Sequence, residues 1–203
     1  ERHAVHYPFS YDANDSIDLA PLLVLLYPAD RPAVEAWVAG VVAIPPAGSL
    51  QLLDRLCSAI HGTFDYRRRV ATGVQSPAET IATASGTCRD FALLFMEAAR
   101  LLGFAARFVT GYLYDQQTDP GQRAADDPEV SGGGSTHAWA DVFIPGAGWI
   151  EFDPTNRIVA GRNLIRVATT RSPAQSVPAS GTYRHEGATF LGIDVRVSFC
   201  RID

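Results

Sequence analysis

The stretch TCRDFALLFMEAARLLG, residues 87–103, decides the fold of this chain. Its apolar residues recur at the spacing of one helix face, and a glycine ends the pattern. Thr87 and Asp90 have the spacing of a capping box, so we expect the helix to begin at Cys88. Beyond the glycine the hydrophobic period becomes that of a strand, with many aromatic and β-branched side chains over residues 104–114. The stretch therefore predicts a helix that leads directly into a strand.

The segments on either side divide into helices and strands in the same order. Prolines punctuate residues 1–30, which we expect to be irregular. Apolar spacing and capping residues then predict three further helices, at residues 31–42, 49–60 and 76–84. A polar, glycine-rich stretch at residues 115–135 is expected to be a mobile loop beside the site. Strand patterns follow at residues 136–144, 149–153, 164–170 and 191–199. Helices first and an antiparallel sheet second make the expected class α+β.

Composition and charge exclude several classes of function. The chain has 203 residues, 47% of them hydrophobic and 19% charged, as in an ordinary protein of one or two domains. A formal charge of -5 argues against a nucleic-acid partner, and no apolar run is long enough to predict a membrane partner. The three cysteines show no disulfide framework, so we expect a reducing, cytoplasmic location. Metal-ligand spacings are lacking, and we expect neither a metal nor another cofactor.

Cys88 is the candidate nucleophile because of its place at the start of a helix. The unpaired N–H groups and the positive end of the helix dipole favour a thiolate there. The same N–H groups can bind the oxyanion that forms during acyl transfer. Cys57, by contrast, lies on the apolar face of the helix predicted at residues 49–60, where we expect a buried, inert thiol.

A thiolate needs a proton partner, and His137 is the candidate because it lies on a strand beside the glycine-rich loop. Asp153 ends the next strand and can hold the imidazole in place. The two side chains share a face only if the strands pair with an odd loop or a bulge, for instance with Ile144 opposite Gly148. A regular four-residue loop would separate them and leave Asp141 or Glu151 as the orienting carboxylate.

Two further positions are candidates with open alternatives. Gln75 lies upstream of Cys88 and is a candidate second donor to the oxyanion. Tyr66 is a rival for that role, and Gln75 is equally interpretable as a surface glutamine. Trp139 shares a strand face with His137, so it either forms a wall of the substrate groove or belongs to the core.

Four blocks of this sequence closely resemble the bacterial transglutaminase-like family, whose members are often labelled proposed cysteine proteases of the papain-like superfamily. They appear in the family's order, at residues 86–91, 105–112, 136–140 and 149–156. The resemblance implies a helix with the cysteine packed on an antiparallel sheet with the other two residues. It also implies that Cys88 is the nucleophile, His137 the general base and acid, and Asp153 the residue that orients the histidine.

The resemblance also shapes the expected organisation and activity. We expect residues 1–45 to be an N-terminal flanking segment, a possible remnant of a lead domain, and residues 46–203 to be the catalytic core with C-terminal strands. The expected activity is thiol-dependent acyl transfer on a peptide or protein substrate, with hydrolysis favoured. Transamidation by a protein-glutamine transglutaminase is the alternative, as is a non-catalytic peptide-binding module. Acetyl transfer from a thioester is a weaker option.

Overall fold

The computed structural model describes residues 2–43, 48–67, 73–114 and 136–177, together with positions 187 and 189. Helices occupy the first half: α1 (Arg2–Val5), α2 (Ala13–Leu23), η1 (Pro28–Asp30), α3 (Arg31–Val41), α4 (Ser49–Thr63), α5 (Pro77–Thr83) and α6 (Cys88–Leu101). Two short strands, β1 (Asp65–Tyr66) and β2 (Ser85–Gly86), lie among these helices. The other strands follow α6: β3 (Ala106–Leu113), β4 (Thr136–Ile144), β5 (Gly148–Asp153), β6 (Ile158–Val159) and β7 (Leu164–Thr170), before the short helix η3 (Pro173–Gln175). This order confirms the predicted α+β class.

The main sheet is antiparallel, and its strand order is β6-β5-β4-β3-β7. The strand that carries His137, β4, is therefore the central one, bordered by β5 and β3. Strands β1 and β2 form a separate parallel pair just before α6. Strand β5 pairs with β4 from Ala140 to Ile144, and β3 pairs with it as far as His137, which lies opposite Gly111.

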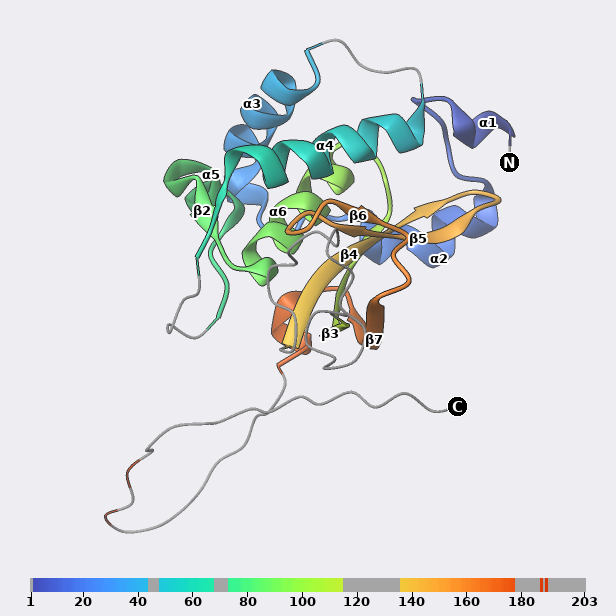
Figure 1. Ribbon diagram of the computed structural model, residues 1–203. Coiled ribbons are helices and arrows are strands. Elements are labelled where there is room, and N and C mark those ends of the chain that lie inside the picture. The colour runs from blue at the N-terminus through green and yellow to red at the C-terminus, as the bar shows by residue number, and fades with distance from the viewer. Residues whose placement is uncertain are drawn as a thin grey trace, which may run out of the picture.

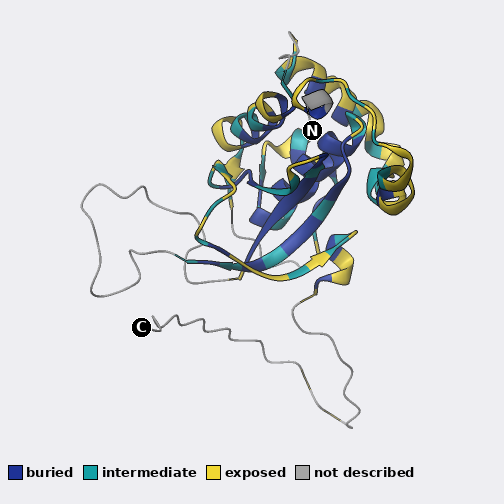
Figure 2. Cartoon of the chain, turned by 90° about the vertical axis from the view of Figure 1, so that its right-hand side faces the viewer, coloured by how far each residue is buried: buried dark blue, intermediate teal, exposed yellow. Residues whose placement is uncertain are grey.

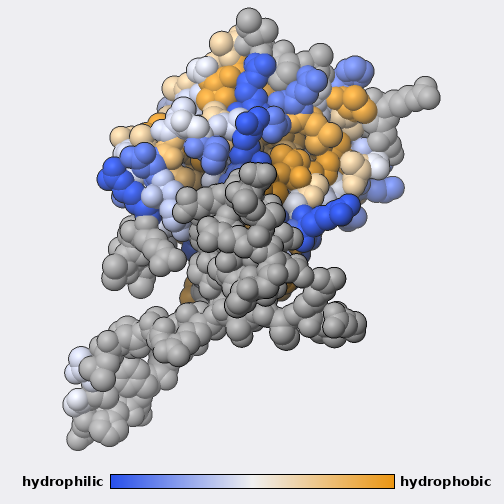
Figure 3. All heavy atoms as spheres, in the orientation of Figure 1, coloured by the Kyte–Doolittle hydropathy of each residue, from blue (hydrophilic) through white to orange (hydrophobic). Residues whose placement is uncertain are grey.

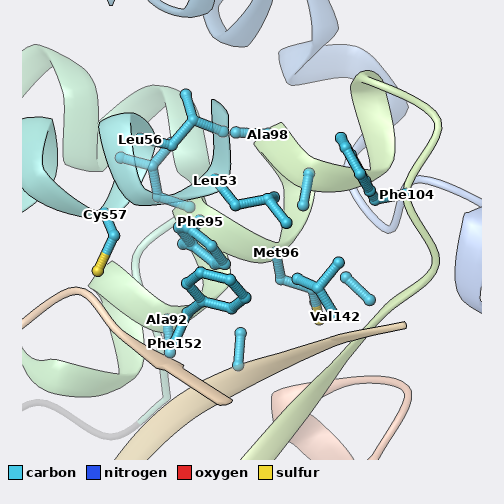
Figure 4. Packing of buried hydrophobic residues seen from close by; sticks show 14 of the residues in the cluster. Leu53, Leu56, Cys57, Ala92, Phe95, Met96, Ala98, Phe104, Val142 and Phe152 are labelled. Atoms are coloured by element: carbon cyan, nitrogen blue, oxygen red, sulfur yellow. The ribbon is translucent and has the colours of Figure 1, made fainter. Parts of the chain in front are cut away.

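Helix α6 lies between α4 and the sheet and forms the centre of the core (Figures 1 and 4). Leu53 and Leu56 of α4 meet one side of α6, and Phe95 of α6 stacks on Phe152 of β5 with ring centroids 5.2 Å apart. Figure 2 shows the result: β4 and α6 are buried, whereas the outer helices expose one face. Because α6 is buried along almost its whole length, the position of its first residue, Cys88, is strongly constrained.

The predicted register of β4 and β5 is confirmed. Ile144 pairs with Gly148, and Ala140 pairs with Phe152, so the connection is the odd loop that places His137 and Asp153 on one face. Gly146 and Gly148 have φ values of 81° and 77°, which side chains other than glycine rarely adopt. The turn glycines therefore set the register on which the candidate site depends.

The expectation that residues 1–30 are irregular is wrong, because α2 spans Ala13–Leu23. The Asp12 side chain caps this helix by accepting from Asp15 N at 2.8 Å. The helix was not predicted because a proline inside a helix, here Pro21, usually breaks it. Its missing N–H would have met the carbonyl of Ile17, a residue that is 75% exposed, so water can satisfy that oxygen. The loop predicted at residues 115–135 and the strand predicted at 191–199 lie outside the described residues.

The surface mixes apolar and polar residues. On the face shown in Figure 3, apolar residues gather to the right of centre and polar residues border them. Large exposed apolar side chains in the described part are spread over several elements: Val5, Ile17, Val24, Leu50, Val159, Ile165, Val167 and Val177. No helix within the described ranges has the length and apolar character needed to cross a membrane.

Gly111 of β3 provides a first test of this packing. A Cβ at this position would collide with the carbonyl oxygen of Ile165 and lie 2.8 Å from the Trp139 ring. Gly111→Ala is expected to lower the free energy of unfolding by about 3 kcal/mol, because the backbone of β7 would have to move. Gly40→Ala in α3 is the matched control, with nothing within 4 Å of the added Cβ, and should be neutral or stabilising by up to about 1 kcal/mol. Urea unfolding of both variants measures the difference, and equal stabilities would contradict the packing described here.

Candidate active site

Cys88 is the first residue of α6, and only 8% of its surface is exposed. The backbone N–H groups of Cys88 and Arg89 make no hydrogen bond to any described residue, as expected in the first turn of a helix. Both the positive end of the helix dipole and these free donors surround the thiol. The position can therefore stabilise negative charge on sulfur and on an adjacent oxygen.

Asp90 holds the start of α6 in place, which confirms the predicted pairing with Thr87. Its buried carboxylate accepts from Thr87 N at 2.8 Å, from Thr87 Oγ1 at 2.9 Å and from Gln75 N at 2.7 Å. Gly86 is required for this arrangement, since a Cβ there would lie 2.9 Å from the Asp90 Cβ. The carboxylate thus ties the segment before α5 to the helix that carries Cys88.

His137 and Asp153 form a buried pair between β4 and β5. His137 Nε2 lies 2.8 Å from Asp153 Oδ2, and both side chains are fully buried. The other ring nitrogen, Nδ1, is also buried and has no hydrogen-bond partner among the described residues. Because the carboxylate accepts the hydrogen of Nε2, Nδ1 is the nitrogen left to exchange a proton with the Cys88 thiol.

The turn after β5 fixes the Asp153 carboxylate. Asp153 Oδ1 accepts from Thr155 N at 2.9 Å, and Asp153 Oδ2 accepts from Asn156 Nδ2 at 2.8 Å. Asn156 was missed as a functional residue by the sequence analysis, although it lies in one of the family-like blocks. From the other side, Cys57 Sγ of α4 donates to Asp153 O at 3.4 Å. The hydrogen bonds from the turn orient the carboxylate, whose Oδ2 faces His137 Nε2, and the Cys57 contact holds the main chain of Asp153.

The other carboxylates considered for this role have different partners. Asp141 accepts from Arg107 Nε at 3.0 Å and from Arg166 Nη2 at 3.3 Å, and Glu151 accepts from Arg166 Nη2 at 2.8 Å. Both belong to an ion-pair network with these arginines and make no contact with His137. Asp153 is therefore the carboxylate that the fold brings to the histidine.

The electrostatics of the pair favour a protonated histidine. Burial is the largest influence on the pKa of His137 and lowers it, but the charge and hydrogen bond of Asp153, together with the Cys88 thiol, raise the pKa to about 10. Burial raises the pKa of the Cys57 thiol far above its ordinary value, with the charges of Asp153 and Asp54 adding to the effect. The two described cysteines thus differ in their surroundings, because burial opposes a thiolate at Cys57, whereas Cys88 shares a cavity with His137.

Cys88 and His137 line one cavity of about 410 Å³. Around them are Thr87, Arg89, Thr110 and Thr136, and the remaining described walls are Tyr27, Gly73, Val74, Ser172, Pro173, Ala174 and Val177. Tyr27 and the lining residues of the segment after β7 carry no sequence signal of a site. They were therefore missed as parts of the cavity wall. No group of three or more potential metal ligands occurs in the part of the chain that the structure describes.

Gln75 and Trp139 do not line this cavity. The Gln75 side-chain amide donates to Thr83 Oγ1 at 3.3 Å, and its backbone N–H is bound by Asp90. Trp139 is fully buried among Val109, Leu113 and Leu164, with its ring 6.2 Å from that of His137. The structure thus places Trp139 in the core, because Gly111 leaves room for the indole inside the sheet packing. Tyr66 packs on Phe91 and is also absent from the described cavity wall.

Replacing Asp153 with asparagine should change the pH dependence of stability. The ordinary pKa of His137 is 6.5, and the folded protein raises it to about 10. A raised pKa contributes stability that is fully present below about pH 6.5 and is lost as the pH rises through about 10. The difference in unfolding free energy between wild type and Asp153→Asn should therefore be on the order of a few kcal/mol near pH 6 and shrink towards pH 10. Urea titrations across this range measure it, and a constant difference would contradict the His137–Asp153 ion pair.

An α+β fold in which a helix-terminal cysteine shares a cavity with a histidine–aspartate pair defines the papain-like class of cysteine-dependent proteins. The chain belongs to the transglutaminase-like superfamily, whose sequence model matches residues 36–154. Members of this superfamily are typically cysteine-dependent enzymes, and the match confirms the resemblance seen in the sequence.

Relatives of the chain are bacterial and longer than it is. An uncharacterized protein of Mycobacterium tuberculosis is 33% identical over 162 residues, which cover 76% of this chain and 49% of that protein. An uncharacterized protein of Mycobacterium leprae is 32% identical over 128 residues, or 63% of this chain and 43% of that protein. The chain thus spans about half the length of the curated relatives it matches.

A solved structure shares the fold. A proposed cysteine protease from Cytophaga hutchinsonii superposes with a TM-score of 0.63 at 23% identity, over 86% of this chain and 53% of that protein. At this identity the likeness bears on the fold alone.

Proposed function

We propose that this protein is a cysteine-dependent hydrolase of peptide or amide bonds, in which Cys88, His137 and Asp153 act together. The observation that carries the proposal is the buried His137–Asp153 pair, because His137 lines the same cavity as Cys88 and its Nδ1 has no hydrogen-bond partner among the described residues. Cys88 is the nucleophile, His137 transfers the proton, and Asp153 orients the ring and favours its protonated form.

The first half-reaction forms an acyl-enzyme. The Cys88 thiolate attacks the carbonyl carbon of the substrate, and an S–C bond forms. The free N–H groups of Cys88 and Arg89 are placed to receive the resulting oxyanion. When the C–N bond breaks, protonated His137 gives its Nδ1 proton to the leaving amine, and the acyl group stays on sulfur.

The second half-reaction removes the acyl group. Neutral His137 takes a proton from water while the water oxygen attacks the thioester, and the acid leaves as the S–C bond breaks. Cys88 and His137 return to thiolate and imidazolium, so no cofactor is consumed.

An amine in place of water would make the enzyme a transglutaminase, and one observation favours water. No aspartate or glutamate is among the described residues that line the cavity, whereas Arg89 and protonated His137 are cationic. An incoming lysine ammonium would meet repulsion there without a carboxylate partner. A non-catalytic peptide-binding module is less favoured, because peptide binding alone requires no proton-transfer pair beside a thiol.

Incubating the protein with a mixture of unfolded protein fragments in heavy-oxygen water, and analysing the products by mass, distinguishes these functions. Hydrolysis should yield new carboxyl groups that carry the heavy oxygen, and Cys88→Ala should yield none. Adding an excess of a primary amine should leave these products dominant. Amine-linked products in place of acids would support transglutaminase activity, and neither product in any condition would contradict catalysis.

A further inference from the structure

The segment after β7 forms an apolar wall of the cavity that holds Cys88. Pro173, Ala174 and Val177 line the cavity from this segment, together with the polar residue Ser172. Ala174 and Val177 are exposed to solvent, and Val177 is 54% exposed. A large apolar side chain that is exposed in the empty cavity gains stability when another apolar group covers it.

Arg89, the neighbour of Cys88, fixes this wall to α6. Its Nη2 donates to Pro173 O at 2.8 Å, and its Nη1 lies 3.5 Å from Ser176 O. The guanidinium also lies 5.0 Å from the centre of the Phe108 ring. Because these contacts occupy the guanidinium, Arg89 is a positioning residue for the wall rather than a free site for a substrate carboxylate. Its charge still opposes the entry of a basic side chain.

A second part of the cavity wall, formed by residues before α6, is apolar as well. Tyr27 and Val74 line the cavity there. Glu97 Oε2 accepts from Leu26 N at 2.9 Å and from Tyr27 N at 3.0 Å, so the backbone at Tyr27 is fixed to α6 as Arg89 fixes the other wall. Both walls are therefore preformed, and neither offers a carboxylate among its described residues.

From these walls we propose that the enzyme selects substrates whose acyl residue has a neutral, apolar side chain, and that Val177 and Ala174 determine this specificity. The inference rests on the function proposed above. After the first step the acyl group of the substrate is bonded to Cys88 Sγ. The side chain of the substrate's acyl residue is therefore the one held nearest to these walls. Burial against them favours an apolar side chain and disfavours a charged one, which would lose water without gaining a partner.

Aryl esters of single N-acetyl amino acids test the proposal. The p-nitrophenyl esters with leucine, glutamate and lysine side chains are compared, and each rate of acylation is divided by the rate with a small free thiol. The corrected rate for leucine should exceed those for glutamate and lysine by about tenfold or more. Equal corrected rates would overturn the proposal. The p-nitrophenyl ester of acetate has no side chain, so its failure to acylate Cys88 would overturn the proposed function itself and this inference with it.

Two valines provide a matched pair of variants. Val177→Asp places a carboxylate in the wall, and Val167→Asp makes the same change on β7 at a residue that is 62% exposed and lies outside the described lining. Val177→Asp should lower the leucine-to-lysine ratio about tenfold, whereas Val167→Asp should leave the ratio unchanged. Should Val177→Asp not fold, Ala174→Asp has the same expected effect. An unchanged ratio in the folded wall variant, or an equal change in Val167→Asp, would overturn the assignment.

Discussion

Replacement of His137 by glutamine is expected to slow the alkylation of Cys88 at about pH 6 by roughly a hundredfold. In the wild type the raised pKa of His137 keeps an imidazolium in the cavity that Cys88 lines, where its charge can stabilise negative charge on the sulfur. Glutamine is of similar size but carries no charge, so the thiolate loses its partner. Timed labelling with iodoacetamide followed by peptide mapping measures the rate at each cysteine.

Two internal comparisons accompany this experiment. His6→Gln changes an exposed histidine outside the cavity wall and should leave the rate at Cys88 as in wild type. Cys57 should stay unlabelled in every variant, because it is fully buried and its pKa is raised. Equal labelling of Cys57 and Cys88, or an unchanged rate in His137→Gln, would contradict the pairing of Cys88 with His137.

Asp90→Asn is expected to lower the free energy of unfolding by about 2–4 kcal/mol and to slow the labelling of Cys88. Both oxygens of Asp90 accept hydrogen bonds, Oδ1 from Gln75 N and Oδ2 from Thr87 N and Oγ1. An asparagine amide would turn its NH₂ group towards one of these donors and leave that donor unpaired in the interior. The first turn of α6 would then loosen around Cys88.

Glu79→Gln is the matched control for Asp90→Asn. Glu79 occupies the equivalent position in the first turn of α5, where it is exposed. Its loss of charge should change stability by less than about 0.5 kcal/mol. Chemical denaturation and the labelling assay apply to both variants. A neutral Asp90→Asn would show that its three hydrogen bonds do not hold the helix start.

The helix, its first residue and the pairing of β4 with β5 could be predicted because each follows from local chemistry. Thr87 and Asp90 mark a helix start by their spacing, and the structure joins them by hydrogen bonds. The turn glycines allow the odd loop, and the requirement that His137 and Asp153 share a face excludes the regular alternative. Periodicity and turn chemistry act over a few residues and are therefore visible in a single sequence.

Contacts between distant segments could not be predicted in the same way. Arg89 meets Pro173 across 84 positions of the chain, and no local pattern marks either residue for this contact. Trp139 shares the alternation of His137 yet lies in the core, because Gly111 on the neighbouring strand gives its ring room. The Gln75 side-chain amide points to Thr83. Sequence spacing does not determine which rotamer this side chain adopts. The cavity walls thus depend on tertiary packing, whereas the reactive groups depend on motif and register.

Mass analysis of an acid-quenched reaction with p-nitrophenyl acetate tests the central claim most directly. The account predicts one acetyl group per chain, mapped to the peptide that contains Cys88, and its loss on longer incubation as water regenerates the thiol. Asp153→Asn should accumulate this adduct more slowly, and Cys88→Ser should show no adduct on a thiol at that position. Acetylation of Cys57 in place of Cys88, or an intact wild-type protein that gains no acetyl group, would contradict the account.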